Sequence, residues 1–266
     1  MTLPVALSIA GSDSGGGAGI QADLKTFHAF GVFGTTAVTA ITVQDTAGVH
    51  GVHAVPVQIV RRQIEVVARD LKPTGCKTGM LATTELVEAV AAAIQNESLP
   101  NYVLDPVMVA SSGDRLLDRD AEWAVRELLV PLATVVTPNL DEARLLTGLP
   151  IDDEAEMRAA GERLLELGAS AALVKGGHLS SDEVVDVLVD RSGVHAWRRP
   201  RVDTTSTHGT GCSLSAAIAA GLARGQDLRG AVMEALDYVH RAMLAAPGLG
   251  RGGHGPLNHM VPGSRA

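Results

Sequence analysis

Residues 207–213, Thr-His-Gly-Thr-Gly-Cys-Ser, join a glycine turn to an apolar, alanine-rich segment typical of a helix. Glycines let the backbone turn so that several N–H groups converge, and the start of a helix adds a partial positive charge. We therefore expect this segment to bind a phosphate or a developing oxyanion, with Cys212 at the mouth of the site. Taken alone, the same residues also fit a structural turn beside a small buried thiol.

A second glycine-rich segment, residues 11–19, contains five glycines in nine residues and follows the first predicted strand. A tight turn between a strand and a helix needs one or two glycines, so five indicate a close approach of the backbone to a ligand. The segment is not a P-loop, because the Gly-Lys-Ser/Thr ending is absent. Asp23, one turn into the following helix, either faces back toward the strand ends or is a solvated helix carboxylate.

Three further side chains are candidates for ligand contacts. The amide of Gln44 presents a donor beside an acceptor, which matches the edge of an aminopyrimidine, although a loop glutamine is usually only solvated. Met80 either packs on a flat ring or belongs to the core. Lys175 ends an apolar run beside two glycines, and either contacts a nucleotide phosphate or extends to solvent.

Residues 137–142, Thr-Pro-Asn-Leu-Asp-Glu, follow a strand and begin a helix. Asn139 is a natural N-cap and Glu142 falls at the third helical position, so the two are compatible with a capping box and nothing more. The functional alternative is that Glu142 and Asp105, from neighbouring strand ends, hold hydrated Mg²⁺ against phosphate oxygens. Residues 248–253 match the dinucleotide fingerprint, but we reject it because no strand precedes and no helix follows.

The elements that must position these residues alternate along the chain. Short apolar runs predict strands, and longer segments with a helical period predict helices. The strands are expected at 5–10, 36–43, 102–105, 134–137 and 171–175, and the helices at 20–30, 59–71, 84–94, 121–129 and 154–167. Such strands belong to a mainly parallel sheet covered by helices on both faces, with ligands beyond the carboxyl ends of the strands.

Two segments depart from this alternation and resemble hairpins. Residues 43–55 carry two glycines among alternating valines, and residues 184–197 carry an Arg-Ser-Gly turn between valine-rich runs. The first is a candidate lid over the site. From Pro247 onward the chain is rich in glycine and histidine, which predicts a tail that covers the surface without regular structure.

Composition limits the classes of protein. With 266 residues and 46% hydrophobic content, the chain can bury one large core, and we expect a single domain over residues 1–266. A net charge of −8 without a long basic cluster argues against nucleic acid as a partner. The apolar runs are shorter than a membrane span and the start lacks a basic signal region, so we expect no membrane association and a cytoplasmic protein. Two distant cysteines fit a reducing compartment.

Taken together, these motifs resemble the hydroxymethylpyrimidine and phosphomethylpyrimidine kinases of thiamine biosynthesis, which have the ribokinase-like, three-layer α/β fold. The resemblance extends in order over nearly the whole chain. It rests on the glycine block with 21–26 (Gln-Ala-Asp-Leu-Lys-Thr), Gln44, 77–81 (Lys-Thr-Gly-Met-Leu), 104–108 (Leu-Asp-Pro-Val-Met), 137–139, 175–178 (Lys-Gly-Gly-His) and 207–212.

The resemblance implies ATP-dependent phosphorylation of 4-amino-5-hydroxymethyl-2-methylpyrimidine and then of its monophosphate at one site, by a homodimer that uses ATP and Mg²⁺. It also implies a role for each candidate residue. For the pyrimidine, Gln44 would bind the edge and Gly11, Asp23, Met80 and Val107 would surround the ring. For the phosphates, Gly209, Thr210 and Gly211 would form the anion hole and Lys175 would bind phosphate. Asp105, Asn139 and Glu142 would organise Mg²⁺ and its waters, and Asn139 and Thr210 would also contact the nucleotide.

Cys212 stands where sugar kinases of the wider superfamily have an aspartate base. A helix start lowers a thiol pKa from about 8.5, so Cys212 is a candidate base for the first transfer. Three alternatives remain. The first is a pyridoxal kinase, which Gln44 and Met80 disfavour, and the second is a binding protein without turnover. The third is a hydrolase or acyl transferase with Cys212 as nucleophile and His208 nearby, for which no orienting carboxylate or amide is evident.

Overall fold

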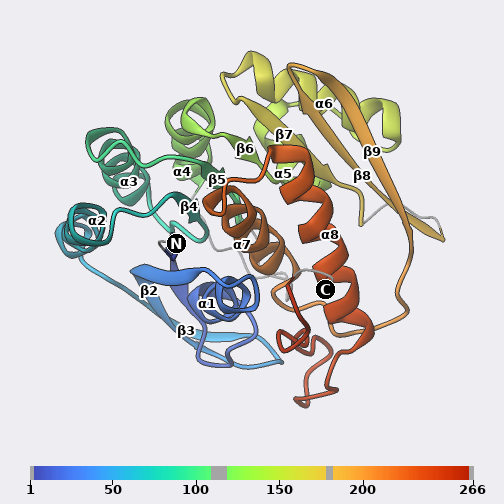
Figure 1. Ribbon diagram of the computed structural model, residues 1–266, viewed down its shortest axis with the longest axis horizontal. Helices are drawn as coiled ribbons and strands as arrows, with labels where there is room; N and C mark the ends of the chain where they lie inside the picture. Colours follow the sequence, from blue (N-terminus) through green and yellow to red (C-terminus); the bar gives the residue numbers. More distant parts are fainter. Residues whose placement is uncertain (1–2, 109–118, 178–181, 264–266) are drawn as a thin grey trace.

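The computed structural model describes residues 3–108, 119–177 and 182–263, and its centre is one sheet of nine strands (Figure 1). The order across the sheet is β3-β2-β1-β4-β5-β6-β7-β8-β9. The strands from β2 to β7 in this order run parallel, whereas β3, β8 and β9 pair antiparallel at the two edges. Their bounds are β1 Val5–Ser12, β2 Phe33–Gln44, β3 Val49–Ala54, β4 Gly75–Thr78, β5 Tyr102–Leu104, β6 Val135–Val136, β7 Ala171–Lys175, β8 Glu183–Asp190 and β9 Gly193–Pro200.

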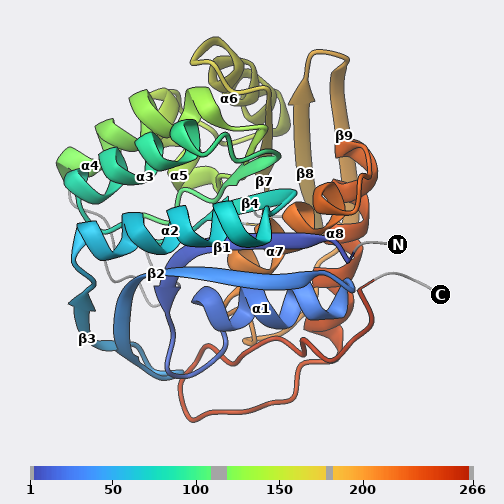
Figure 2. The ribbon, with the colours of Figure 1, turned by 60° about the vertical axis from the view of Figure 1, so that its left-hand side comes forward.

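Helices cover both faces, and the predicted three-layer α/β architecture is confirmed (Figures 1 and 2). The first group consists of α1 Gly19–Ala29, α7 Thr210–Ala223 and α8 Leu228–Leu244. The second consists of α2 Val57–Leu71, α3 Thr84–Asn96, α4 Arg119–Ala124, the π and 3-10 turns Val125–Leu129 and Val130–Leu132, α5 Leu140–Thr147 and α6 Glu154–Glu166. Within the described ranges, no helix combines the length and apolarity needed to cross a bilayer.

Alternation along the strands explains the two layers. In β1, Ala6 packs with α1, α7 and α8, whereas Leu7 and Ile9 pack with the helices of the opposite face. Because both faces are covered, the central strands read as continuous apolar runs rather than as an alternating pattern. These runs are the signal that made the sheet predictable from the sequence.

Helix α7 is buried along its length and lies close to the sheet. A Cβ atom on Gly75 of β4 would lie 2.7 Å from the carbonyl oxygen of Ala219, so only glycine permits this approach. On its other side, a Cβ atom on Gly221 would lie 2.8 Å from the Cβ of Ala231 in α8. Small residues therefore fix the helix whose start carries the anion-binding segment.

Most predicted elements are present, with differences at their ends. The hairpin predicted at 43–55 corresponds to the end of β2 with β3, and the one at 184–197 to β8 with β9. The helix predicted at 121–129 is interrupted, since α4 passes into a π turn at Val125. The short strand β4 and the helix α8 were absent from the predicted elements.

The C-terminal segment lacks helix and strand as predicted over its described residues 247–263, but two of its side chains are buried. Leu257 is 3% exposed and His259 is 8% exposed. The Nε2 atom of His259 lies 2.8 Å from the hydroxyl of Ser213, at the start of α7. Earlier in the tail, the N–H of Gly252 donates to the hydroxyl of Thr46 in the β2–β3 turn. The tail thus connects α7 with the hairpin.

We expect the buried His259 to make stability fall in mild acid. Burial lowers the pKa of His259 from its usual value near 6.5 to about 4. The unfolded chain therefore gains a proton as the pH falls through 6.5, while the folded chain stays neutral until about pH 4. The free energy of unfolding should decrease across this interval by up to about 3 kcal/mol, from 1.36 kcal/mol per pH unit. Urea unfolding at both ends of the interval measures the loss. His259→Gln should flatten the profile, and an equally steep profile in that variant would contradict the assignment.

Candidate active site

A cavity of about 1130 Å³ opens at the carboxyl ends of the parallel strands. Of the site residues predicted from the sequence, all except Asp23 line it: Gly11, Gln44, Met80, Asp105, Val107, Asn139, Glu142, Lys175, Gly209, Thr210, Gly211 and Cys212. They come from the ends of six strands and from the start of α7. The fold thus brings together residues spread over most of the chain. Of the resembling motifs, His178 lies outside the described residues.

The anion-binding segment forms the N-terminus of α7. Gly209 is the N-cap residue and has a left-handed conformation with φ 81°. A Cβ atom there would lie 1.8 Å from the carbonyl oxygen of Gly17, so the contact between the two glycine-rich loops requires glycine. The hydroxyl of Thr210 donates to the carbonyl of Thr207 at 2.6 Å and closes the turn. The N–H of Thr210 donates to the carbonyl of Thr207 at 3.2 Å, so the next N–H groups at the start of α7 are the ones available to an anion.

Lys175 and two carboxylates meet beside this helix start. The Nζ atom of Lys175 lies 3.7 Å from Oδ1 of Asp105 and 4.0 Å from Oε2 of Glu142. Burial raises the pKa of Glu142, as does Asp105, while Lys175 opposes the rise. For Lys175, burial alone would lower the pKa, but the two carboxylates raise it, so the ammonium stays charged. The lysine therefore compensates a pair of buried acidic groups.

The capping interpretation of Asn139 and Glu142 is confirmed. The Asn139 side chain accepts from the N–H of Glu142 at 2.9 Å, and the Glu142 carboxylate accepts from the N–H of Asn139 at 2.8 Å. The Oδ2 atom of Asp105 accepts from the hydroxyl of Ser215 at 3.1 Å. Because Glu142 is engaged in the cap, Asp105 has more free acceptor positions than Glu142. Within the described residues no group of three or more His, Cys, Asp or Glu side chains could hold a metal ion. The two carboxylates fit Mg²⁺ only with phosphate oxygens and waters as the other ligands.

Asp23 differs from its predicted role. It is fully buried below the cavity, accepts from the hydroxyl of Ser8, and lies 3.1 Å from the Nζ atom of Lys77, which is also fully buried. Lys77 in turn lies 4.0 Å from Oδ2 of Asp105. Asp23 therefore does not line the ring site. The sequence analysis assigned no role to Lys77, because its four-residue strand β4 is too short and too polar to signal a buried ion pair.

The expectation of a lowered pKa for Cys212 is wrong. Burial raises the pKa of this thiol to about 11, and the nearby carboxylates of Asp105 and Asp23 add to the rise. Lys77 and the N–H of Gly19 oppose it without reversing it. The helix start alone was considered from the sequence, whereas the depth of burial decides the outcome. At neutral pH the side chain is a thiol rather than a thiolate.

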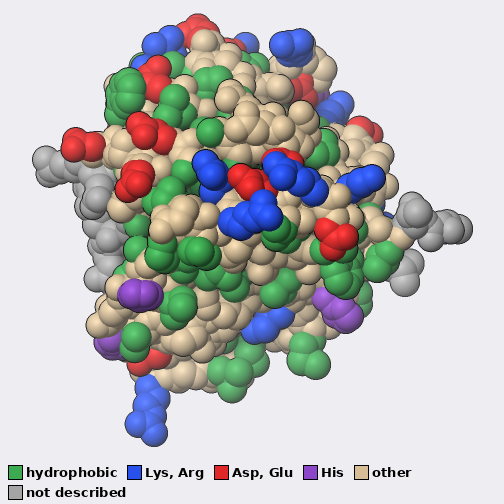
Figure 3. All heavy atoms as spheres, turned by 90° about the vertical axis from the view of Figure 1, so that its left-hand side faces the viewer, with side chains coloured by type: hydrophobic (Ala, Val, Ile, Leu, Met, Phe, Trp, Pro, Cys, Tyr) green, Lys and Arg blue, Asp and Glu red, His purple; other side chains and the backbone are tan. Residues whose placement is uncertain are grey.

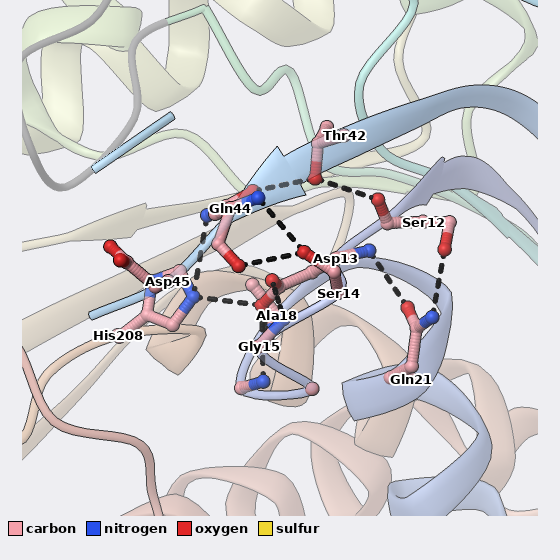
Figure 4. A network of polar contacts seen from close by, with 12 residues as sticks. Ser12, Asp13, Ser14, Gly15, Ala18, Gln21, Thr42, Gln44, Asp45 and His208 are labelled. Carbon is pink, nitrogen blue, oxygen red and sulfur yellow. Dashed lines mark hydrogen bonds and ion pairs between the residues drawn. The ribbon is translucent and has the colours of Figure 1, made fainter. Parts of the chain in front are cut away.

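A polar network joins Gln44 to the glycine-rich loop (Figure 4). The ring of His208 lies between Asp13 and Gln44, with Nε2 2.9 Å from Oδ2 of Asp13 and 3.4 Å from the amide nitrogen of Gln44. The Gln44 amide oxygen lies 3.1 Å from the hydroxyl of Thr42. Asp13 had no assigned role in the sequence analysis, and His208 was considered only as the partner of a nucleophilic cysteine. Sequence spacing gave no signal for this contact, because 195 positions separate Asp13 from His208.

The three-layer fold, with a helix-start anion site beside a lysine and two carboxylates, defines the class as a ribokinase-like small-molecule kinase. Solved kinases share the fold. A Bacillus subtilis pyridoxal kinase in complex with ADP has a TM-score of 0.91 and 38% identity, covering 97% of this chain and 98% of that one. A phosphomethylpyrimidine kinase from Clostridium difficile has a TM-score of 0.81 and 39% identity, covering 90% and 99%.

The chain belongs to the phosphomethylpyrimidine kinase family, which it matches over residues 13–258. It is 51% identical over 257 residues to a hydroxymethylpyrimidine/phosphomethylpyrimidine kinase from Rhizobium meliloti, covering 96% of each chain. It is 49% identical over 259 residues to the Streptomyces coelicolor enzyme of the same name, covering 97% and 95%. The protein is therefore a phosphotransferase, and the family resemblance seen in the sequence is confirmed.

Proposed function

We propose that the protein phosphorylates 4-amino-5-hydroxymethyl-2-methylpyrimidine with ATP, and then phosphorylates the monophosphate to the diphosphate for thiamine diphosphate synthesis. The observation that carries the proposal is one cavity lined both by the amide of Gln44 and by the anion segment with Lys175. The relatives named for these two activities support the substrate assignment. Solved relatives in complex with ADP and with AMP-PCP support ATP as the donor.

In this proposal each part of the cavity has one task. Gln44 reads the pyrimidine edge, while Gly11, Met80 and Val107 surround the ring. The helix start at Gly209, Thr210 and Gly211 stabilises charge on the transferred phosphoryl group. Lys175 neutralises phosphate, and Asn139 and Thr210 contact the nucleotide. Asp23 acts from below the cavity by holding Lys77 in place.

Mg²⁺ would be held by Asp105, with Glu142 as the second carboxylate. When bound, it would supply positive charge that offsets the charge of the phosphate groups. Because the carboxyl of Glu142 already caps α5, we assign it to orienting Mg²⁺-bound waters rather than to direct coordination. Lys175, within 4.0 Å of both carboxylates, balances their charge before the nucleotide arrives.

We also propose a cytoplasmic homodimer. Figure 3 views the side of the molecule that carries α2 and β3, and shows hydrophobic side chains over its lower part, below a band of charged groups. Ile41 and Val43 are exposed on the outer face of β2, next to the cavity-lining Thr42 and Gln44. A second copy of the chain would cover this apolar strand. Sedimentation equilibrium tests the proposal, since a monomer mass at all concentrations contradicts it.

The substrate assignment is tested by ADP release with Mg-ATP. Hydroxymethylpyrimidine, its monophosphate and pyridoxal are compared at equal concentrations with the full chain. Turnover of both pyrimidines above pyridoxal supports the proposal. A preference for pyridoxal would instead assign the protein to the vitamin B6 kinases, and no ADP with any of the three would contradict both assignments.

Cys212→Ala separates the two phosphoryl transfers. The first acceptor is an alcohol, which loses a proton, whereas the second is a phosphate oxygen, which needs no base. Because Cys212 is a thiol at neutral pH, it can act as the base only if it loses its own proton when the substrates bind. In that case kcat of the variant should fall for the alcohol by about 10²-fold, the range of general base catalysis, and much less for the monophosphate. Steady-state ADP release with each substrate measures this difference. Equal losses in both steps would exclude the base role and leave Cys212 as a packing residue.

A further inference from the structure

His208 contacts the wall of the cavity at the side chain that reads the substrate. Its side chain is 12% exposed and its ring nitrogen Nε2 lies between Asp13 and the amide of Gln44 (Figure 4). The backbone holds His208 in place, because its N–H donates to the carbonyl of Gly255 in the C-terminal tail. A Cβ atom on Gly17 would lie 2.6 Å from the ring. The imidazole is thus enclosed by two loops and the tail.

The partner of His208 is a carboxylate with a fixed position. The Oδ1 atom of Asp13 accepts from the N–H of Gly15 at 2.7 Å, and Oδ2 accepts from the N–H of Gly17 at 3.0 Å and of Ala18 at 2.8 Å. Although burial alone raises the pKa of Asp13, these bonds and the contact with His208 lower it. An ionised carboxylate only accepts hydrogen bonds, so the hydrogen of this contact belongs to Nε2 of His208.

A second acceptor stands at the other end of the network. The hydroxyl of Thr42 lies 2.8 Å from the carbonyl oxygen of Ser12 and 3.1 Å from the amide oxygen of Gln44. A backbone carbonyl only accepts, so the single hydroxyl hydrogen of Thr42 is drawn toward Ser12. The Gln44 amide therefore lies between an N–H on one side and a hydroxyl oxygen with free lone pairs on the other.

These two neighbours make the two orientations of the Gln44 amide unequal in energy. A half-turn about the last side-chain bond exchanges the amide nitrogen and oxygen. With the nitrogen toward His208, the amide N–H group meets a ring nitrogen whose single hydrogen is already donated to Asp13, and it finds no acceptor there. With the oxygen toward His208, that hydrogen gains a second, weaker acceptor, and the amide nitrogen can donate to the Thr42 oxygen. One orientation is favoured, and the ligand meets a defined order of donor and acceptor.

We propose that His208, held by Asp13, is a positioning residue that fixes the orientation of the Gln44 amide and so decides which heterocycle edge the site accepts. The inference rests on the proposed function. An aminopyrimidine presents a ring-nitrogen acceptor beside a donor amine, and the corresponding oxopyrimidine presents the reverse. An amide that turned freely would read both edges, whereas an amide held in one orientation reads one and leaves the other with unpaired polar groups.

The test compares kcat/KM for 4-amino- and 4-oxo-5-hydroxymethyl-2-methylpyrimidine with Mg-ATP. The wild-type protein should prefer the amino compound by about 10²-fold or more. His208→Leu should reduce this ratio at least tenfold, mainly through KM. His208→Gln places an N–H donor at the same number of bonds from Cα, and should keep the ratio within about threefold. Thr42→Val removes the opposite neighbour of the amide and should also narrow the ratio.

Lys25→Met is the matched control, because Lys25 donates to the carbonyl of Gly16 at 2.6 Å and supports the same loop without touching His208 or Gln44. It should affect both substrates in proportion. If His208→Leu and Thr42→Val, shown by thermal unfolding to be folded, also affect both in proportion, His208 only anchors loops and the inference is overturned. Turnover of the amino compound by the wild-type protein reports separately on the proposed function. Calorimetry gives the ratio of the dissociation constants of the two pyrimidines, which does not depend on turnover. Equal dissociation constants for the wild-type protein would overturn the inference.

Discussion

Replacing Lys175 with methionine should lower kcat by about 10²- to 10³-fold, the loss typical when one preorganised group that stabilises transition-state charge is removed. The Nζ atom of Lys175 lies beside Asp105 and Glu142 and close to Gly211 at the anion segment. It is the cation that the described part of the chain places between the carboxylates and the helix start. Single-turnover phosphorylation with saturating Mg-ATP measures the effect on the transfer itself.

Two comparisons make this result specific. Lys175→Arg keeps the charge but replaces a compact ammonium with a planar guanidinium, so its kcat should lie between those of the methionine variant and the wild type. Thermal unfolding shows whether the methionine variant is intact, because the variant leaves Asp105 and Glu142 without their nearest cation. A kcat within tenfold of the wild type in a folded Lys175→Met protein would exclude Lys175 from charge stabilisation in the transfer.

The second large effect concerns stability rather than turnover. Lys77→Met should lower the free energy of unfolding by about 3 to 5 kcal/mol, because it leaves the buried carboxylate of Asp23 without its cation. Burial raises the pKa of Asp23, and Lys77 and Ser8 oppose that rise. Both members of the pair are fully buried and 3.1 Å apart. Chemical denaturation with a two-state analysis measures the change.

The structure supplies a control and a rescue for this prediction. Lys72→Met changes an exposed lysine five positions away and should alter the free energy of unfolding by no more than about 0.5 kcal/mol. The double variant Lys77→Met, Asp23→Asn removes both charges and keeps a group that accepts from Ser8, so it should recover part of the loss. A single Lys77→Met variant as stable as the wild type would show that the pair contributes nothing.

The sequence predicted the layers well because local pattern and tertiary environment agree. The apolar runs that became β1, β5 and β7 are buried on both faces, and polar side chains after them can only reach the carboxyl edge of the sheet. That geometry is why residues as distant as Gln44 and Lys175 were expected in one cavity. The strand β4, with four residues that include Gly75 and Lys77, was missed because it is too short and too polar to show a period.

The site was less predictable where partners come from distant elements. The contact of Asp13 with His208 depends on how two glycine loops pack, which no local pattern reports. Asp23 is buried with Ser8 and Lys77 instead of lining the cavity, and no local pattern pairs it with a lysine 54 positions away. The pKa of Cys212 depends on burial and on three charged neighbours, so its sign could not be read from the helix start alone.

Residues 248–253, which match the rejected dinucleotide fingerprint, bear on the order in which the protein folds. Gly250 and Gly252 pack so tightly on Thr46 that a Cβ atom at Gly252 would lie 1.8 Å from its carbonyl oxygen. Seven residues later, His259 contacts the start of α7. During synthesis the sheet can assemble from the N-terminal side first. The contacts of the tail with the β2–β3 turn and with the start of α7, however, can form only after residues 252–259 have been synthesised, so the two glycine-rich loops gain this support last.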